Sequence, residues 1–375
     1  MKIVQARKSE NNDWIFINKQ DLKSPLVLVF GNRYLLEDTE IYSEIKKMFP
    51  DGHLVFGSTS GEILSNKIFE NSIAITAIEF EKSNFVIKTE NILLHDKNAY
   101  KAGEALVKKF PKENLKHIFV VSEGSFVNGS DLISGLEYNK NNFAITGGLC
   151  GDDARFEKTL ASYNENPKEG EIIAIGFYGD TLEITFANYG GWMPFGPERM
   201  ITKSKGNILW EIDNAPALDI YKIYLGAKSA ELPHAALLYP LSVKAPGAHE
   251  SLVRTILNID EANNTMTLAG DVPEGSIVQL MMANVDDIAD GAAKAAELAM
   301  ENRKSEPQIG LLVSCVGRKL VMDQRVEEEV EEVQYAVGAD VKLSGFYSYG
   351  EMAPFTHNNN CVLHNQTMTL TLISE

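Results

Sequence analysis

The fold of this 375-residue chain follows from two runs, Leu26-Val-Leu-Val-Phe-Gly31 and Leu54-Val-Phe-Gly-Ser-Thr-Ser-Gly61-Glu62, that flank one helical segment. The first run is apolar throughout and ends in glycine, which predicts a strand buried on both faces. Between the runs, residues 38–49 place Ile41, Ile45 and Met48 on one face at helical spacing. The stretch therefore predicts a strand, an outer helix, and a second strand that enters a glycine turn carrying an acid.

The same pattern occurs twice more along the chain. The second copy runs from Ile118-Phe-Val-Val-Ser122 to Gly147-Gly-Leu-Cys-Gly151-Asp152. The third copy runs from Gly310-Leu-Leu-Val-Ser-Cys315 to Gly345-Phe-Tyr-Ser-Tyr-Gly350-Glu351. In each copy a helix separates the two strands at similar spacing, and further strands follow the turn. A pattern repeated in this way indicates one supersecondary unit used three times.

These repeats predict an α+β or mixed α/β fold of β-α-β-β units, with mixed sheets and outer helices. Two such sheets stacked face to face would form a layered αββα sandwich. Residues 188–197 are dense in glycine and proline, so no element is expected to cross them. We therefore expect an N-terminal segment over 1–25, a domain of two units over 26–198, and a domain over 199–375. The last domain is expected to hold the third unit, a hairpin and a helix.

Composition narrows the class of protein. The chain has 35 Lys and Arg against 52 Asp and Glu, a net charge of −17, so it repels phosphate backbones and anionic lipids. No apolar run reaches the length of a membrane span, and the N-terminus lacks the apolar core of a signal peptide. The cysteines, isolated and odd in number, fit a reducing compartment. We expect a cytoplasmic protein that binds neither nucleic acid nor membranes.

The glycine turns of the first two units carry candidate ligand-binding groups. Such turns point backbone N–H groups into a cleft, hydroxyls add donors, and a neighbouring acid can hold an ammonium group. A small polar ligand such as an amino acid suits this set. The candidates are Ser58, Thr59, Ser60, Glu62, Gly148 and Asp152. The alternative is that these residues only serve turn geometry and close packing.

The third unit adds charge and aromatic side chains. Cys315 ends a strand just before Arg318, and the partner turn carries Tyr347, Tyr349 and Glu351. If the two strands are parallel neighbours, these side chains meet at one sheet edge. Arg318 then suits a carboxylate, Glu351 suits an amine, and the tyrosines form an apolar wall with polar tips. The alternative is an Arg318–Glu351 ion pair that closes the edge.

Two other functions remain open at this point. Cys315 could serve a hydrolase or transferase as a nucleophile, but a thiol enzyme needs a base within hydrogen-bond reach, and no sequence feature fixes one. A cysteine in an apolar strand is more often a small core residue. No metal motif is present, and no cofactor is expected. Non-covalent haem binding through His357, His364 or Cys315 stays an alternative, because haem needs only one axial ligand and an apolar slot.

Several pieces together resemble the FIST sensory domain family, with its N-terminal and C-terminal parts. They are Gly57-Ser-Thr-Ser-Gly61, Gly147-Gly-Leu-Cys-Gly-Asp152, Trp192, the Thr202…Gly206-Asn207 hairpin, Ala215-Pro-Ala-Leu218 with Tyr221, Ser314-Cys-Val-Gly-Arg318, Gly345-Phe-Tyr-Ser-Tyr-Gly-Glu351 and His364-Asn-Gln-Thr367. The resemblance implies a ligand-sensing module in signal transduction that binds small molecules such as amino acids. Some relatives look like haem-containing nitric-oxide sensors, and the family carries no established catalytic set. Because no output domain is expected here, a signal would leave through a separate kinase, cyclase or chemoreceptor.

Overall fold

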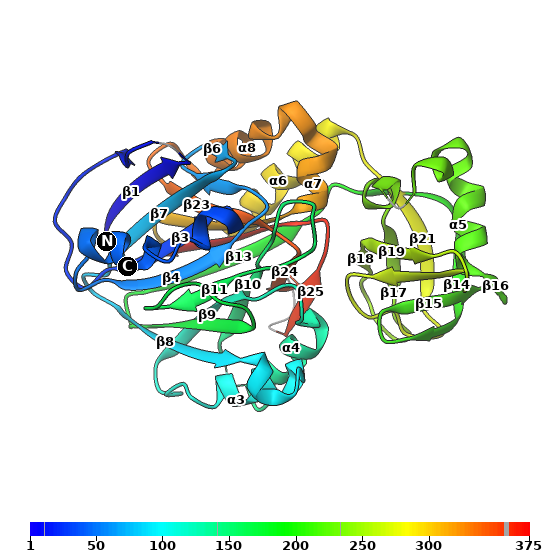
Figure 1. The fold of residues 1–375 in the computed structure, drawn as a ribbon, viewed down its shortest axis with the longest axis horizontal. Coiled ribbons are helices and arrows are strands. Elements are labelled where there is room, and N and C mark those ends of the chain that lie inside the picture. The colour runs from blue at the N-terminus through cyan, green and yellow to red at the C-terminus, as the bar shows by residue number, and fades with distance from the viewer. Residues whose placement is uncertain (11, 141, 233, 356–359) are drawn as a thin grey trace.

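The computed structural model describes residues 1–10, 12–140, 142–232, 234–355 and 360–375, arranged as a large lobe and a small lobe (Figure 1). The large lobe holds all three repeated units, and the small lobe is inserted within the third, after its first strand. The mixed α/β fold of repeated units is confirmed. None of the described helices has the length and apolar character needed to cross a bilayer.

Each unit centres on a six-stranded mixed sheet. The first sheet has the order β11-β4-β3-β7-β1-β2. All of its strands except β11 come from the first repeated unit: β1 (Lys2–Ser9), β2 (Ile15–Phe16), β3 (Leu26–Gly31), β4 (His53–Ser58) and β7 (Ser72–Glu79). The second has the order β25-β24-β10-β9-β12-β8, with β8 (Asn84–Asn91), β9 (Leu115–Ser122), β10 (Ala144–Leu149) and β12 (Glu171–Tyr178). The third has the order β13-β26-β22-β23-β5-β6, with β13 (Glu183–Tyr189), β22 (Ile309–Cys315), β23 (Lys342–Ser348) and β26 (Met368–Ser374).

The remaining strands of these sheets are exchanged in a ring between the units. The hairpin β5 (Glu62–Leu64) and β6 (Lys67–Phe69) leaves the first unit and pairs with β23 of the third. The hairpin β24 (Gly350–Pro354) and β25 (Cys361–His364) leaves the third unit and pairs with β10 of the second. Strand β11 (Ala161–Tyr163) leaves the second unit and pairs with β4 of the first. Each sheet is therefore completed by a strand from another unit.

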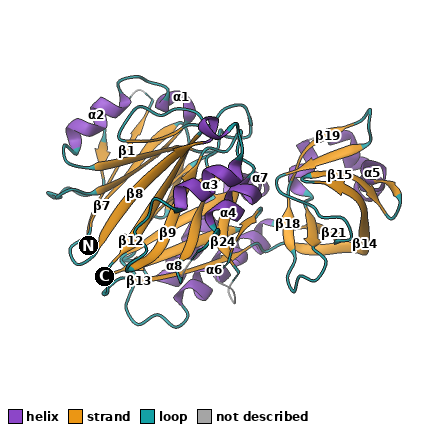
Figure 2. Ribbon diagram, turned by 90° about the horizontal axis from the view of Figure 1, so that it is seen from below, coloured by secondary structure: helices purple, strands orange, loops and turns teal. Residues whose placement is uncertain are grey.

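Helices cover the outer faces of the sheets, as Figure 2 shows. The helices are α1 (Arg33–Leu36), α2 (Ile41–Met48), η1 (Ile92–His95), α3 (Ala99–Val107), α4 (Gly129–Leu136), α6 (Val285–Met300), α7 (Val316–Met322), η4 (Asp323–Arg325) and α8 (Glu327–Val337). The inner faces share one apolar core to which all three units contribute, for example through Phe30, Phe119 and Phe346. The central strands read as continuous apolar runs because both of their faces are buried.

The small lobe has a core of its own. Its elements are β14 (Met193–Lys205), β15 (Ile208–Ile212), β16 (Ala215–Pro216), α5 (Ala217–Leu225), η2 (Gly226–Glu231), η3 (His234–Leu238), β17 (Leu241–Lys244), β18 (Leu252–Arg254), β19 (Ile256–Asp260), β20 (Thr265–Leu268) and β21 (Ile277–Met282). The glycine-rich segment 188–197 thus marks where the chain leaves the large lobe, and the third unit packs with the first two. The expected N-terminal segment contributes β1, which pairs along its whole length with β7.

Candidate functional site

The three glycine turns meet where the units join. Backbone hydrogen bonds link them in a cycle: Ser60 N–H donates to the Tyr347 carbonyl at 2.9 Å, and Tyr349 N–H donates to the Leu149 carbonyl at 3.2 Å. Gly151 N–H closes the cycle on the Ser58 carbonyl at 2.9 Å. The sequence candidates from three distant segments therefore lie together, because the exchanged hairpins β5–β6 and β24–β25 begin directly at two of these turns.

All three turn acids are buried, and two of them accept hydrogen bonds from hydroxyl groups. Glu62 accepts from Thr59 Oγ1 and from Ser72 Oγ, both at 2.6 Å. Glu351 accepts from Ser348 Oγ at 2.6 Å, and from the backbone N–H and Oγ1 of Thr367 at 3.1 and 3.0 Å. Burial raises the pKa of both carboxyls to about 8, against the lowering effect of the hydroxyl donors. Both side chains therefore carry a proton through much of the neutral range.

The third turn acid, Asp152, is equally buried but is paired with cations. Its Oδ1 accepts from Nε of Arg33 and from Nε of Arg155, each at 3.0 Å. Arg33 is itself buried, whereas the Arg155 side chain is 30% exposed. A buried carboxylate between two guanidinium groups is stabilised in its charged form.

Arg318 is fully buried, and each nitrogen of its guanidinium donates a hydrogen bond within the protein. Its Nε donates to Glu329 Oε1 at 2.8 Å, Nη2 donates to the Ile288 carbonyl at 2.8 Å, and Nη1 donates to the Gly190 carbonyl. Within the described part of the chain, Arg318 therefore forms its ion pair with Glu329 and not with Glu351. The guanidinium ties α7 to α6, α8 and the exit to the small lobe.

The two candidate tyrosines are held by internal hydrogen bonds. The Tyr347 hydroxyl donates to Glu329 Oε2 at 3.0 Å. The Tyr349 hydroxyl accepts the backbone N–H of Phe156 at 3.0 Å, and the two rings stack at 4.4 Å between centroids. Both tyrosines are thus part of the junction between units.

Every sequence candidate at the junction is buried, with at most 8% of a side chain exposed. These residues are Ser58, Thr59, Ser60, Glu62, Gly148, Asp152, Cys315, Arg318, Tyr347, Tyr349 and Glu351. They are brought together but offer no open surface among themselves. A ligand of this protein would contact them only through a neighbouring cavity.

Cys315 does not have the surroundings of an activated nucleophile. Its thiol is buried, and burial raises its pKa well above the usual value, with Glu351 adding to the shift. A reactive thiol needs an electropositive and accessible position that favours the thiolate. Cys315 N–H donates to the Thr367 carbonyl at 3.2 Å, so the residue fixes the turn before β26.

Tyr349 lines a cavity of about 320 Å³, and a larger cleft of about 630 Å³ lies between the two lobes. Its large-lobe wall includes Tyr189, Trp192, Phe355, His364 and Thr367. Its small-lobe wall includes Glu198, Ser242, Lys244, His249, Glu250 and Gln279. The large-lobe wall thus carries several aromatic rings, and the small-lobe wall combines polar and charged side chains with apolar Val253, Ile277 and Met281.

Charges of both signs on the small-lobe wall lack ion-pair partners. Lys244, Glu198 and Glu250 are exposed, and none lies within 4.0 Å of an opposite charge among the described residues. Unpaired charges of both signs facing an aromatic wall suit a ligand that carries an ammonium and a carboxylate group.

Thr367 connects the cleft with the buried junction. It lines the cleft, and its hydroxyl and N–H hold Glu351. The neighbouring Gln366 accepts the Trp192 indole N–H on its carbonyl at 2.8 Å. Next to it, both amide atoms of Asn365 are buried without a hydrogen-bond partner among the described residues. Such atoms are rare in folded proteins and mark this segment as a site of special interactions.

Comparison with family models identifies this arrangement. The FIST N domain model matches residues 25–215, and the FIST C domain model matches residues 217–354. The chain belongs to the FIST family. FIST domains are associated with sensing in signal transduction.

Individual relatives add little to the family assignment. An uncharacterised protein of Methanocaldococcus jannaschii is 23% identical over 379 aligned positions, which cover 89% of this FIST chain and 71% of the relative. Among solved structures, the alignment with a chorismatase covers 100% of this chain and 98% of the chorismatase chain, with 8% sequence identity and a TM-score of 0.30. PurLQS from Thermotoga maritima covers 84% and 74%, with 8% identity and a TM-score of 0.20. Likenesses this weak carry no argument about activity.

Of the two histidines considered as haem ligands, the structure describes His364. His357 lies outside the described residues. His364 lines the cleft of this FIST protein, and its Nε2 donates to the Ala353 carbonyl at 3.1 Å, which leaves Nδ1 as the ring atom able to bind a metal. Burial lowers the pKa of His364 to about 4 and keeps the ring neutral. Among the described residues, no three His, Cys, Asp or Glu side chains are grouped to hold a metal ion.

Sequence reasoning missed both the buried partners and the polar wall of the cleft. A signal for Glu329 was present, because it lies on the same helical face as Val326 and Val330, where an acid is unexpected. Arg33 and Arg155 carry no such signal. The cleft residues of the small lobe were also beyond sequence reasoning, since they depend on how the two lobes face each other.

Proposed function

We propose that this FIST protein is a cytoplasmic sensory module that binds a small amino-acid-like metabolite in the cleft between its lobes. We further propose that it reports occupancy to a separate signalling protein, such as a kinase, a cyclase or a chemoreceptor. The observation that carries the proposal is the cleft itself, with an aromatic wall opposite unpaired charges of both signs. No step of this function requires catalysis by Cys315.

The position of the cleft supports a sensing role. A ligand shifts a conformational equilibrium only if it binds one state better than another. A ligand that contacts both lobes favours the arrangement in which both walls lie within reach. Through Thr367, the same ligand also bears on Glu351 and thus on the junction of the three units.

The test is a screen of the proteinogenic L-amino acids by thermal shift and by the fluorescence of Trp192. We expect at least one amino acid to raise the melting temperature and change the fluorescence. Lys244→Ala and Glu250→Gln should each lower the affinity for that ligand about tenfold or more, because each removes a charge-assisted contact. The N-acetylated and the decarboxylated forms of the same ligand should bind weakly to the unchanged protein.

Matched controls separate the cleft from the rest of the molecule. Lys205→Ala removes an exposed lysine of the same lobe outside the cleft and should leave binding unchanged. Trp192→Phe should abolish the fluorescence response while the protein stays folded. The proposal would be contradicted if no amino acid gave a response. It would also be contradicted if Lys244→Ala and Glu250→Gln bound the ligand as tightly as the unchanged protein does.

A haem-based gas sensor is the second candidate, and the neutral ring of His364 in the cleft is the observation that favours it. Haem would supply gas binding at its iron, and His364 Nδ1 is the described atom that could hold it. A visible spectrum after addition of haem, compared between the unchanged protein and His364→Ala, tests this candidate. A spectrum of free haem in both samples would reject it.

A further inference from the structure

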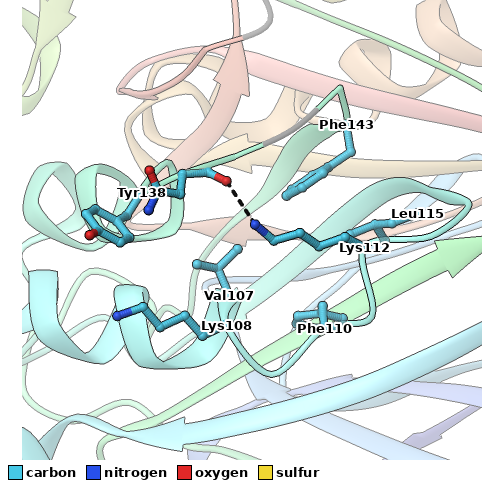
Figure 3. A pocket seen from close by; sticks show the side chains of 8 residues that line it. Val107, Lys108, Phe110, Lys112, Leu115, Tyr138 and Phe143 are labelled. Atoms are coloured by element: carbon cyan, nitrogen blue, oxygen red, sulfur yellow. Dashed lines mark hydrogen bonds between the residues drawn. The ribbon is translucent and has the colours of Figure 1, made fainter.

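A second cavity, of about 210 Å³, lies on the second unit at the ends of α3 and α4 (Figure 3). Its floor consists of buried apolar side chains, and its rim carries two cations. The floor residues are Val107, Phe110, Leu115 and Phe143, and the cations are Lys108 and Lys112. None of these residues lines the inter-lobe cleft or belongs to the junction, so the proposed function leaves this pit unexplained.

The two lysines differ in how they are bound. Lys108 Nζ forms an ion pair with Glu104 at 2.7 Å and lies 5.0 Å from the centre of the Tyr138 ring. Lys112 extends across the pit, and its Nζ donates a long hydrogen bond, 3.3 Å, to the Asn139 carbonyl (Figure 3). No acid among the described residues lies within ion-pair distance of Lys112. Its ammonium is therefore the group that an incoming anion can pair with.

The segment beside the pit is rich in lysine in a strongly acidic protein. Residues 108–116 contain Lys108, Lys109, Lys112 and Lys116 against the single acid Glu113, although the whole chain has a net charge of −17. Lys108 and Lys109 form ion pairs with Glu104 and Glu90, so Lys112 and Lys116 are the lysines of this segment without an ion pair among the described residues. An anion that most of the surface repels is attracted to these two ammonium groups. The apolar floor beneath the free cation favours an anion with a flat hydrophobic body.

We propose that this pit binds a small aromatic monocarboxylate, with its ring against Phe110 and Phe143 and its carboxylate on the Lys112 ammonium. The size agrees, because a dry apolar cavity of about 150 Å³ already accepts benzene, and the pit of about 210 Å³ leaves room for a carboxylate. The ring satisfies the apolar floor, and the charge-assisted hydrogen bond fixes its orientation.

The proposal is tested by titrating the full chain with benzoate and with phenylacetate. Calorimetry and ligand-observed NMR detect the binding. We expect saturable binding at millimolar concentration that weakens as salt is added. Lys112→Met keeps the apolar stem but removes the charge, and should weaken benzoate about tenfold or more. Benzamide, which has the same shape without the charge, should bind the unchanged protein about as weakly as benzoate binds the variant.

Two further variants make the result specific to the pit. Lys116→Met removes an exposed lysine of the same segment that does not line the pit, and should leave benzoate affinity unchanged. Lys244→Ala should also leave it unchanged, which separates this site from the cleft. The proposal would be overturned if benzoate did not bind. It would also be overturned if Lys112→Met bound benzoate as tightly as the unchanged protein, or if the unchanged protein bound benzamide as tightly as benzoate.

Discussion

The three glycine turns share one sequence pattern but bury their acids in two different ways. The pattern ends in Gly-Glu at Glu62 and Glu351, and in Gly-Asp at Asp152. Glu62 and Glu351 are held by a hydroxyl from the turn and by Ser72 or Thr367, which stand at the start of the same strand of the repeat. The second unit has apolar Leu149 where the other turns have a hydroxyl. Its Asp152 is paired with Arg33 and Arg155 instead.

This difference shows that one backbone position tolerates two electrostatic solutions. A buried acid is stable either as a neutral carboxyl that hydrogen-bonds to hydroxyls or as a carboxylate enclosed by cations. The first solution responds to pH near neutrality, because burial raises the pKa of Glu62 and Glu351 to about 8. The two kinds of turn should therefore react differently to the same perturbations.

The largest expected effect comes from neutralising the paired acid. Asp152→Asn removes the fully buried carboxylate of Arg33 and leaves this guanidinium only the more exposed Glu37 and Glu157. The free energy of unfolding should fall by about 3 kcal/mol, the low end of the range for a broken buried ion pair. Urea unfolding followed by circular dichroism measures the loss. Asp180→Asn, at an exposed loop position, serves as the control and should change stability by less than about 0.5 kcal/mol. An equally small loss in Asp152→Asn would show that the pairing contributes little.

The second prediction concerns pH. Glu62 and Glu351 have a pKa of about 8 in the folded chain, above the usual 4.5, so their contribution to stability is lost as pH rises through this interval. Burial lowers the pKa of His117 to about 3 and of His364 to about 4, from 6.5, so their contribution is gained as pH rises to 6.5. The two trends oppose each other below pH 6.5. Between pH 6.5 and 8 the two carboxyls dominate, because the buried cysteines and tyrosines have reference pKa values of 9.0 and 10.0.

The free energy of unfolding should therefore fall between pH 6.5 and 8. The slope is at most about 1.4 kcal/mol per pH unit for each carboxyl. Glu62→Gln and Glu351→Gln should each remove part of the slope, and the double variant should remove nearly all of it. Urea unfolding at a series of pH values in this range is the measurement. An unchanged slope in the double variant would mean that the two carboxyls are ionised in the folded protein.

The smallest expected effect comes from removing the hydroxyl donors. Thr59→Val and Ser348→Ala each delete one hydrogen bond to a neutral carboxyl and should cost about 0.5–1.5 kcal/mol. Both variants should also raise the pKa of the neighbouring acid further, because the hydroxyls lower it. Thr181→Val, at an exposed position, is the matched control. A loss as large as that of Asp152→Asn would erase the distinction between the two kinds of turn.

Much of the fold was accessible from the sequence, because its signals are local. The apolar runs at β3, β9 and β22 and the glycine turns after β4, β10 and β23 identified the repeated unit. The strand exchange was not accessible, since β5 and β11 are only three residues long and their partners lie in other units. The burial of Arg318 followed neither from its position nor from its charge, because it depends on Glu329 of a later helix. The structure brings the candidate residues of the three turns together, but the cleft beside them depends on the orientation of the small lobe, which no local sequence signal encodes.

The ring of exchanged strands also bears on how the chain folds during synthesis. The sheet of the first unit is complete once residue 163 has left the ribosome, because β11 then becomes available. The central unit must wait for β24, so β10 keeps an unpaired edge until residue 354 has been made. An exposed strand edge is a template for aggregation. During translation the edge of β10 therefore stays open to such pairing until residue 354 has emerged.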